Sequence, residues 1–159
     1  MAKDCGRSKV GSRIHLPKPF HRGNKYSIIS AITNKKVIAS VYCEGSVNGN
    51  IFSDFIEQCL VPELKPNHRL IMDNVAFHKI KQVEELVSKT GASILFLPPY
   101  SPDLSPIEFM YSKIKSILRR CAARTAETFQ DAISKAFYAI RESDLLNWFI
   151  ECGYKIKHL

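Results

Sequence analysis

Residues 97–108 read LPPYSPDLSPIE and join the end of a short apolar run to the start of a helix. The prolines stop the apolar run and stiffen the connection. Ser105, Pro106 and Glu108 fit a helix N-terminus, with serine as the cap, proline at the first helical position and glutamate at the third. The stretch therefore predicts a strand end and a helix start that lie close together.

A second stretch, LIMDNVAFH at residues 70–78, has an acidic residue directly after an apolar run. In α/β folds, functional sites gather at the C-terminal ends of buried strands, which makes Asp73 a candidate carboxylate. Each acidic residue also has a structural interpretation, because Asp73-Asn74 is a common turn pair and Glu108 suits a capping box. His78 alone is more often a surface or core histidine than a ligand.

The remaining sequence predicts an α/β domain with a mixed sheet. Residues 25–33 and 36–42 form two strands of a hairpin around Asn34-Lys35. Gly91 is expected to terminate a helix. The other expected elements are helices over 51–60, 80–87, 107–118 and 125–141, strands at 70–72 and 93–97, and a last apolar turn or short helix around Leu145, Trp148 and Phe149.

Length and composition fit a single domain of 159 residues, 45% hydrophobic and 24% charged. We expect residues 1–24 to be an irregular basic lead-in, residues 25–108 to be the sheet core with both acidic segments, and residues 109–159 to be C-terminal helices. No apolar run is long enough for a membrane span, and the N-terminus lacks the pattern of a signal peptide. A cytoplasmic protein without a membrane partner is therefore expected.

The net charge narrows the class of partner, and the cysteine spacing narrows the kind of site. The net charge of +8 favours binding to nucleic acid, because basic side chains attract polyanions by counterion release. The five cysteines lie far apart, with no CxxC pair, which suits reduced and mostly buried thiols and argues against a disulfide framework or a zinc site.

Together, the two acidic segments resemble the second and third acidic motifs of the mariner superfamily of DDE transposases, most closely its bacterial insertion-sequence branch. The motifs stand here as MDNVAFH and LPPYSPDLSPIE, followed by the basic helix FMYSKIKSILRR. Between Asp73 and Glu108 lie 34 residues (108 − 73 − 1). The resemblance also includes GNKYSIISAI, residues 44–49 and Gly91-Ala92, and it covers most of residues 20–120. The family usually has asparagine at the position of Ser105, a change that preserves the cap.

The resemblance implies an RNase H-like fold, a mixed sheet flanked by helices. It also implies DNA transposition by a metal-dependent endonuclease and strand-transfer activity, with three carboxylates and two divalent ions, magnesium or manganese. Asp73 and Glu108 would be catalytic metal ligands, with Asn74 and His78 as supporting neighbours. Four basic residues would contact the phosphate backbone, although a solvated helix face is an equally good interpretation of each: Lys113, Lys115, Arg119 and Arg120.

The family carries its first catalytic aspartate in the first, central strand of the sheet, which precedes the hairpin. Upstream of residue 25 the only acidic residue is Asp4, and its neighbours resemble the stretch that follows the missing strand. We therefore expect a chain without the first strand, the first aspartate and the family's N-terminal helix-turn-helix region. Without the central strand, two strand edges would be open, so marginal stability or association is expected.

The leading interpretation is a truncated or split DNA transposase, inactive alone, that acts on transposon ends and target DNA. Its partner would be full-length transposase or the product of an upstream reading frame. An alternative is a non-catalytic DNA-binding or regulatory fragment that associates with full-length transposase. A third interpretation, another RNase H-like nuclease, is disfavoured by the proline-rich motif.

Overall fold

The computed structural model describes residues 25–74, 81–121 and 126–156. Its strands form an antiparallel hairpin, β1 (Tyr26–Ile32) with β2 (Val37–Glu44), and a parallel pair, β3 (Arg69–Met72) with β4 (Ser93–Phe96). Within these residues the two pairs are separate two-stranded sheets. The predicted hairpin and the two further predicted strands are thus present, but the described strands form two separate sheets in place of the expected mixed sheet.

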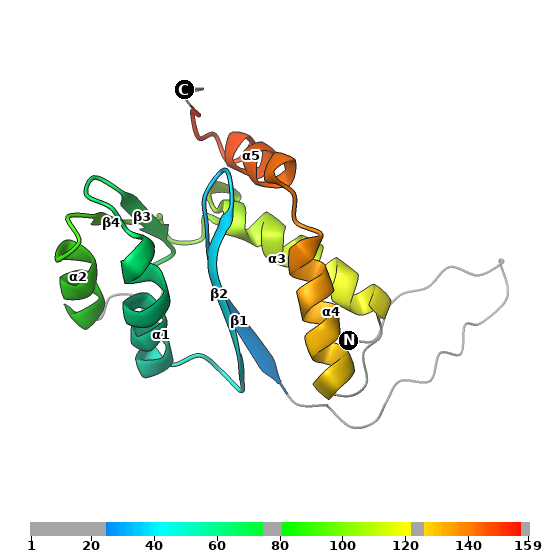
Figure 1. The fold of residues 1–159 in the computed structure, drawn as a ribbon. Helices are drawn as coiled ribbons and strands as arrows, with labels where there is room; N and C mark the ends of the chain where they lie inside the picture. Colours follow the sequence, from blue (N-terminus) through cyan, green and yellow to red (C-terminus); the bar gives the residue numbers. More distant parts are fainter. Residues whose placement is uncertain (1–24, 75–80, 122–125, 157–159) are drawn as a thin grey trace, which may run out of the picture.

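The helices lie on both sides of the hairpin (Figure 1). Beside the parallel pair are α1 (Gly49–Phe55), α2 (Lys81–Ser88) and, directly after α1, the π-helical turn η1 (Ile56–Leu60) and the 3-10 turn η2 (Val61–Glu63). On the other side are α3 (Pro106–Cys121), α4 (Ala126–Tyr138) and α5 (Glu142–Glu151). Among the described helices, none combines the length and the apolar character that a membrane span requires.

The helix predicted over residues 51–60 begins earlier, at Gly49, and its second half is a π-helical turn. The side chain of Asn48 accepts from the backbone N–H of Ile51, which caps α1 and sets its start. At the other end the N–H of Val61 is donated to the carbonyl of Ile56, five residues back, so the last turn is wider than an α-helix. Pro62, which has no N–H to donate, then ends the run in η2.

Two hydrophobic cores pack on opposite faces of the hairpin, because successive strand residues point to opposite sides. Ile29 belongs to a core built from α1, η1, α2 and the parallel pair. Ile28 and Ile32 pack on the other face, against the buried residues Met110 and Ile114 of α3. The hairpin therefore separates the two groups of helices.

Other predictions have mixed outcomes. Gly91 terminates α2 with φ of +78°, as expected for a helix-ending glycine. The last helix, α5, is ten residues long, more than the predicted turn or short helix. The prediction of mostly buried thiols is wrong for the described cysteines: Cys152 is buried, Cys43 and Cys59 are partly exposed and Cys121 is exposed, although all four are free. Cys5 lies outside the described residues.

Candidate functional site

A cavity of about 930 Å³ lies between β1 and β3. Residues 28–32 of β1 and 69–72 of β3 line it, together with much of the proline-rich stretch at residues 97–108. Asp73, Asn74 and Glu108 all line this same cavity. The structure therefore brings the two acidic segments of the sequence to one place.

Asp73 follows the last residue of β3. The strand end is fixed by its buried neighbour Met72, whose carbonyl accepts from the N–H of Leu97 at 2.8 Å. Asp73 and Asn74 themselves are exposed. β3, whose last residue Met72 is buried, thus ends in two exposed polar side chains at the cavity, which is the placement predicted from LIMDN.

Glu108 lies in the first turn of α3, which begins at Pro106 as the sequence predicts. The proline-rich stretch folds into a 3-10 turn, η4 (Pro102–Leu104), directly before the helix. The hydroxyl of Tyr154, beyond α5, donates to the carbonyl of Leu104 at 2.8 Å and ties this turn to the C-terminal part. The N–H of Glu108 is donated to the carbonyl of Ser105 at 3.1 Å, so the helix start is held by main-chain bonds.

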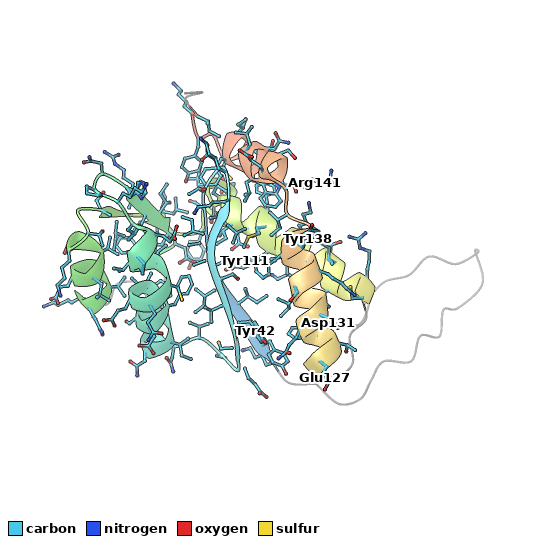
Figure 2. All side chains as sticks on the ribbon, viewed as in Figure 1. Tyr42, Tyr111, Glu127, Asp131, Tyr138 and Arg141 are labelled. Carbon is cyan, nitrogen blue, oxygen red and sulfur yellow. The ribbon has the colours of Figure 1, made fainter. Side chains whose placement is uncertain are left out.

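Tyr111 joins α3, the helix that carries Glu108, to the hairpin, and the sequence did not single it out. Its hydroxyl donates to the main-chain carbonyl of Ile28 on β1 at 3.3 Å, and Figure 2 shows it beside the hairpin. Burial raises the pKa of Tyr111, hydrogen bonding to Ser30 opposes that rise, and the negative charges of Glu108 and Asp73 add to it. Both carboxylates are therefore close enough to act on one phenol.

Tyr100 is a second residue at the cavity that the sequence did not single out. Its φ of +58° is in the left-handed region that non-glycine residues rarely adopt, and its side chain is fully exposed. The signal that could have indicated it was an aromatic residue between the prolines of LPPYSPD.

The other predicted site residues have different environments. Lys113 is partly buried and forms an ion pair with Asp144 of α5 at 2.5 Å. This hydrogen bond, together with the N–H of Arg141, lowers the pKa of Asp144. Lys115, Arg119 and Arg120 are exposed on α3. His78 lies outside the described residues.

Asp73, Glu108 and Asn74 offer carboxylate and amide oxygen atoms at the cavity, and His68, whose Nδ1 accepts from the N–H of Lys65 at 3.2 Å, also lines it. Oxygen ligands suit hard divalent ions such as magnesium. Among residues 25–74, 81–121 and 126–156, no group of three or more His, Cys, Asp or Glu side chains is arranged to hold a metal ion. The described residues thus supply two carboxylates to this site.

Comparison with known proteins supplies a family and a fold. Residues 2–130 match the family model described as DDE superfamily endonuclease. No curated protein matches the chain. Solved structures of one transposase, Mos1, are similar to it at low sequence identity.

The crystal structure of the Mos1 strand transfer complex matches with a TM-score of 0.75 and 15% identity, over 96% of this chain and 47% of that one. The Mos1 mariner paired end complex with Mn gives 0.75 and 17%, over 92% and 46%. The Mos1 transposase catalytic domain with Raltegravir and Mn gives 0.68 and 14%, over 81% and 74%. The chain spans about half the length of the Mos1 chains in the two complexes. At these identities the likeness is one of fold, and it confirms the predicted RNase H-like class.

Proposed function

The chain belongs to the DDE superfamily endonucleases, and from this premise we propose that it is part of the catalytic domain of a DNA transposase of the mariner type. The observation that carries the proposal is the pair of carboxylates, Asp73 and Glu108, which line one cavity. The bacterial insertion-sequence branch is supported by the motif LPPYSPDLSPIE. The proposed location is the cytoplasm, where the protein would be associated with DNA when bound to it.

The residues present fit a divalent metal centre of the hard, oxygen-ligated kind. Asp73 and Glu108 would hold magnesium or manganese, with Asn74 as an adjacent oxygen donor. Such ions, when bound, activate a water or hydroxyl nucleophile and stabilise the leaving oxygen of a phosphoryl displacement. The solved Mos1 catalytic domains with Mn and with Mg are proteins of the same fold.

The described residues contribute two carboxylates, so a third must come from elsewhere for a two-metal site of the DDE kind. We expect residues 25–156 to be inactive on DNA without it. The open edges beside the cavity favour association, so full-length transposase or an upstream-frame product is the proposed protein partner. The alternative function, a non-catalytic DNA-binding regulator of full-length transposase, would use the same association without the metal.

DNA is the proposed polyanionic partner, and three exposed basic residues of α3, namely Lys115, Arg119 and Arg120, are its proposed phosphate contacts. Lys113 is a weaker candidate than its sequence suggests, because Asp144 already engages it at 2.5 Å. The net charge of +8 supports binding that weakens steeply with salt.

The test measures binding of duplex DNA by fluorescence anisotropy, with and without magnesium. Without metal, Asp73→Asn and Glu108→Gln should each tighten binding, because each removes a negative charge near the phosphates. With metal the same substitutions should weaken it, because they remove ligands of a cation that would bridge protein and phosphate. Glu127→Gln, on the exposed surface of α4, is the control and should give the same sign in both conditions.

Two results distinguish the metal-dependent transposase from the non-catalytic regulator. A reversal of sign on adding magnesium, seen for Asp73 and Glu108 and not for Glu127, supports the metal-dependent transposase site. DNA binding that depends on Arg119 and Arg120 but shows no reversal favours the non-catalytic regulator. Lys89→Gln, an exposed charge after α2, controls for the loss of one positive charge.

A further inference from the structure

We propose that Tyr154 is a positioning residue for Glu108. Residues 142–154, which comprise α5 and the turn after it, form a C-terminal brace along the first half of α3. The hydroxyl of Tyr154 holds the turn that precedes Glu108. The inference rests on the proposed function, because it concerns the geometry of one of the two carboxylates that would hold the metal.

Two contacts fix the C-terminal brace on α3, one at each end of α5. At its start, Asp144 pairs with Lys113 at 2.5 Å. Beyond its end, the hydroxyl of Tyr154 donates to the carbonyl of Leu104 at 2.8 Å. The later residue of the brace thus meets the earlier residue of the other segment, so α5 runs antiparallel to residues 104–113, and Figure 1 shows it beside the start of α3. Glu108 lies between the two contacts in sequence.

The C-terminal end of α5 determines where Tyr154 lies. The N–H of Gly153 donates to the carbonyl of Ile150 at 2.9 Å, and the N–H of Tyr154 donates to that of Phe149 at 3.0 Å. These two bonds, with φ of +82° at Gly153, form a Schellman motif. The hydrophobic contact that accompanies this motif is also present, since the rings of Phe149 and Tyr154 lie 5.5 Å apart between centroids. Tyr154 is therefore held by its own helix end.

The hydroxyl of Tyr154 is connected to Glu108 through the main chain of the turn. Leu104, its acceptor, is the last residue of η4 and adjoins Ser105. The N–H of Ser105 donates back to the carbonyl of Pro102 at 3.0 Å, and the carbonyl of Ser105 accepts from the N–H of Glu108 at 3.1 Å. A displacement of Leu104 would therefore displace the residue to which the amide of Glu108 is bound.

The place of Glu108 in its helix makes such support necessary. Glu108 is in the first turn of α3, and the first N–H groups of a helix have no acceptor within the helix. Helix ends open more readily than helix centres. A ligand for a metal ion must be held within about 0.5 Å of its working position. Tyr154 and Phe149 line the same cavity as Glu108, so the brace acts at the side where the carboxylate would bind the ion.

The first experiment needs no metal and uses the whole 159-residue chain. Tyr154→Phe removes the hydroxyl and keeps the ring. Amide hydrogen exchange of Ser105 and Glu108 should become about fivefold faster, because the turn loses one hydrogen bond, while the amide of Ala139 in the turn after α4 should not change. Phe149→Leu, which keeps the hydroxyl and removes the ring contact, is a second variant and should have a smaller effect at the same two amides.

Ser27→Ala is the matched control. The hydroxyl of Ser27 donates to the carbonyl of Gly45 at 2.6 Å, so this variant also loses a partly buried bond from a side-chain hydroxyl to a main-chain carbonyl. That bond belongs to the hairpin and is remote in sequence from Glu108. Ser27→Ala should leave the exchange of Ser105 and Glu108 unchanged, although it also lowers overall stability.

The second experiment separates positioning from a purely structural role by a double-mutant cycle on Mn²⁺ affinity, measured by electron paramagnetic resonance. Tyr154→Phe should weaken Mn²⁺ binding about fivefold in the parent chain. In the Glu108→Gln background the same substitution should have no further effect, because the carboxylate that it positions is gone. Ser27→Ala should leave Mn²⁺ affinity unchanged in both backgrounds. Circular dichroism verifies that each variant is folded.

The outcomes distinguish failure of this proposal from failure of the proposed function. Unchanged exchange at Ser105 and Glu108 would overturn the proposal, and so would an affinity loss that persists in the Glu108→Gln background. If Glu108→Gln binds Mn²⁺ as tightly as the parent, the proposed metal site itself fails. Faster exchange in Tyr154→Phe would then show a contact that only stabilises the fold, and the positioning role would be rejected.

Discussion

The hydroxyl of Tyr111 donates to the main-chain carbonyl of Ile28 at 3.3 Å, so a side chain of α3 occupies part of the open edge of β1. The negative charges of both carboxylates of the candidate site raise the pKa of the same phenol. The helix that carries Glu108 is thereby attached to the hairpin at a point where no strand of the described residues pairs. This contact links the stability of the fold to the geometry of the site.

Removing that hydroxyl should cost stability. Tyr111→Phe deletes a partly buried hydrogen bond and should lower the free energy of unfolding by about 1 kcal/mol in urea denaturation. Tyr138→Phe is the matched control, because the side chain of Tyr138 is 94% exposed, and it should change stability by less than about 0.5 kcal/mol. Equal effects in the two variants would show that the Tyr111 bond contributes nothing.

The pKa of Tyr111 should report on the carboxylates. Since the folded pKa is raised above the unfolded value of 10.0, the stability contributed by neutral Tyr111 is complete below pH 10.0 and is lost as pH rises through the folded pKa. Glu108→Gln removes a negative charge and should lower the pKa of Tyr111, measured by phenolate absorbance against a Tyr111→Phe background. The control Glu142→Gln, on α5, should leave the pKa of Tyr111 unchanged. A Tyr111 pKa that is the same with and without the charge of Glu108 would contradict the geometry of the site.

The ion pair between Lys113 and Asp144 should stabilise the contact of α3 with α5. Lys113→Met should lower the free energy of unfolding at neutral pH by about 1 kcal/mol. Because the pKa of Asp144 is lowered from 3.8, this contribution is present above that pH and is lost as pH falls through the folded pKa. The difference between variant and parent should therefore vanish in strong acid.

The control for this pair is Lys36→Met. Lys36 pairs with Glu63 at 3.1 Å, but the two side chains are 65% and 45% exposed, against 30% and 27% for Lys113 and Asp144. Solvent screening should reduce its effect to a few tenths of a kcal/mol, roughly. A larger loss from Lys36→Met than from Lys113→Met would contradict the assignment.

Alanine substitutions at two glycines allow the stability cost of backbone strain to be distinguished from that of close packing. Gly45 and Gly91 both have positive φ, +89° and +78°, so alanine at either position should cost about 1 kcal/mol. A Cβ at Gly91 would lie 3.2 Å from Cβ of Pro66, whereas at Gly45 nothing lies within 4 Å. Thermal unfolding should therefore show a larger loss for Gly91→Ala than for Gly45→Ala. Equal losses would mean that Pro66 moves without cost.

Much of the fold could be predicted from the sequence where local pattern and burial agree. The hairpin, the parallel strands and the start of α3 at Pro106 follow from alternation, from apolar runs and from proline at a helix start. The π-turn before Pro62 could not be predicted, because spacings of three and four suit an α-helix and a wider turn equally well. The exposure of Cys121, the last residue of α3, likewise depends on tertiary packing, which the local sequence does not determine.

The site was partly predictable for a similar reason. Asp73 and Glu108 were identifiable because each stands at the end of a recognisable segment. Tyr111 was not, since its role depends on a contact 83 residues away along the chain, with Ile28. The ion pair of Lys113 with Asp144 could not be predicted either. A basic residue on an amphipathic helix has the same sequence pattern whether it contacts DNA or a neighbouring helix.

The proposal that Asp73 and Glu108 together form a divalent-metal site can be tested by Mn²⁺ binding to the 159-residue chain, followed by electron paramagnetic resonance. Asp73→Asn and Glu108→Gln should each weaken Mn²⁺ binding at least about tenfold, while Asp54→Asn, on the exposed side of α1, should leave it unchanged. Mn²⁺ binding that is equally strong in all four proteins would contradict the claim.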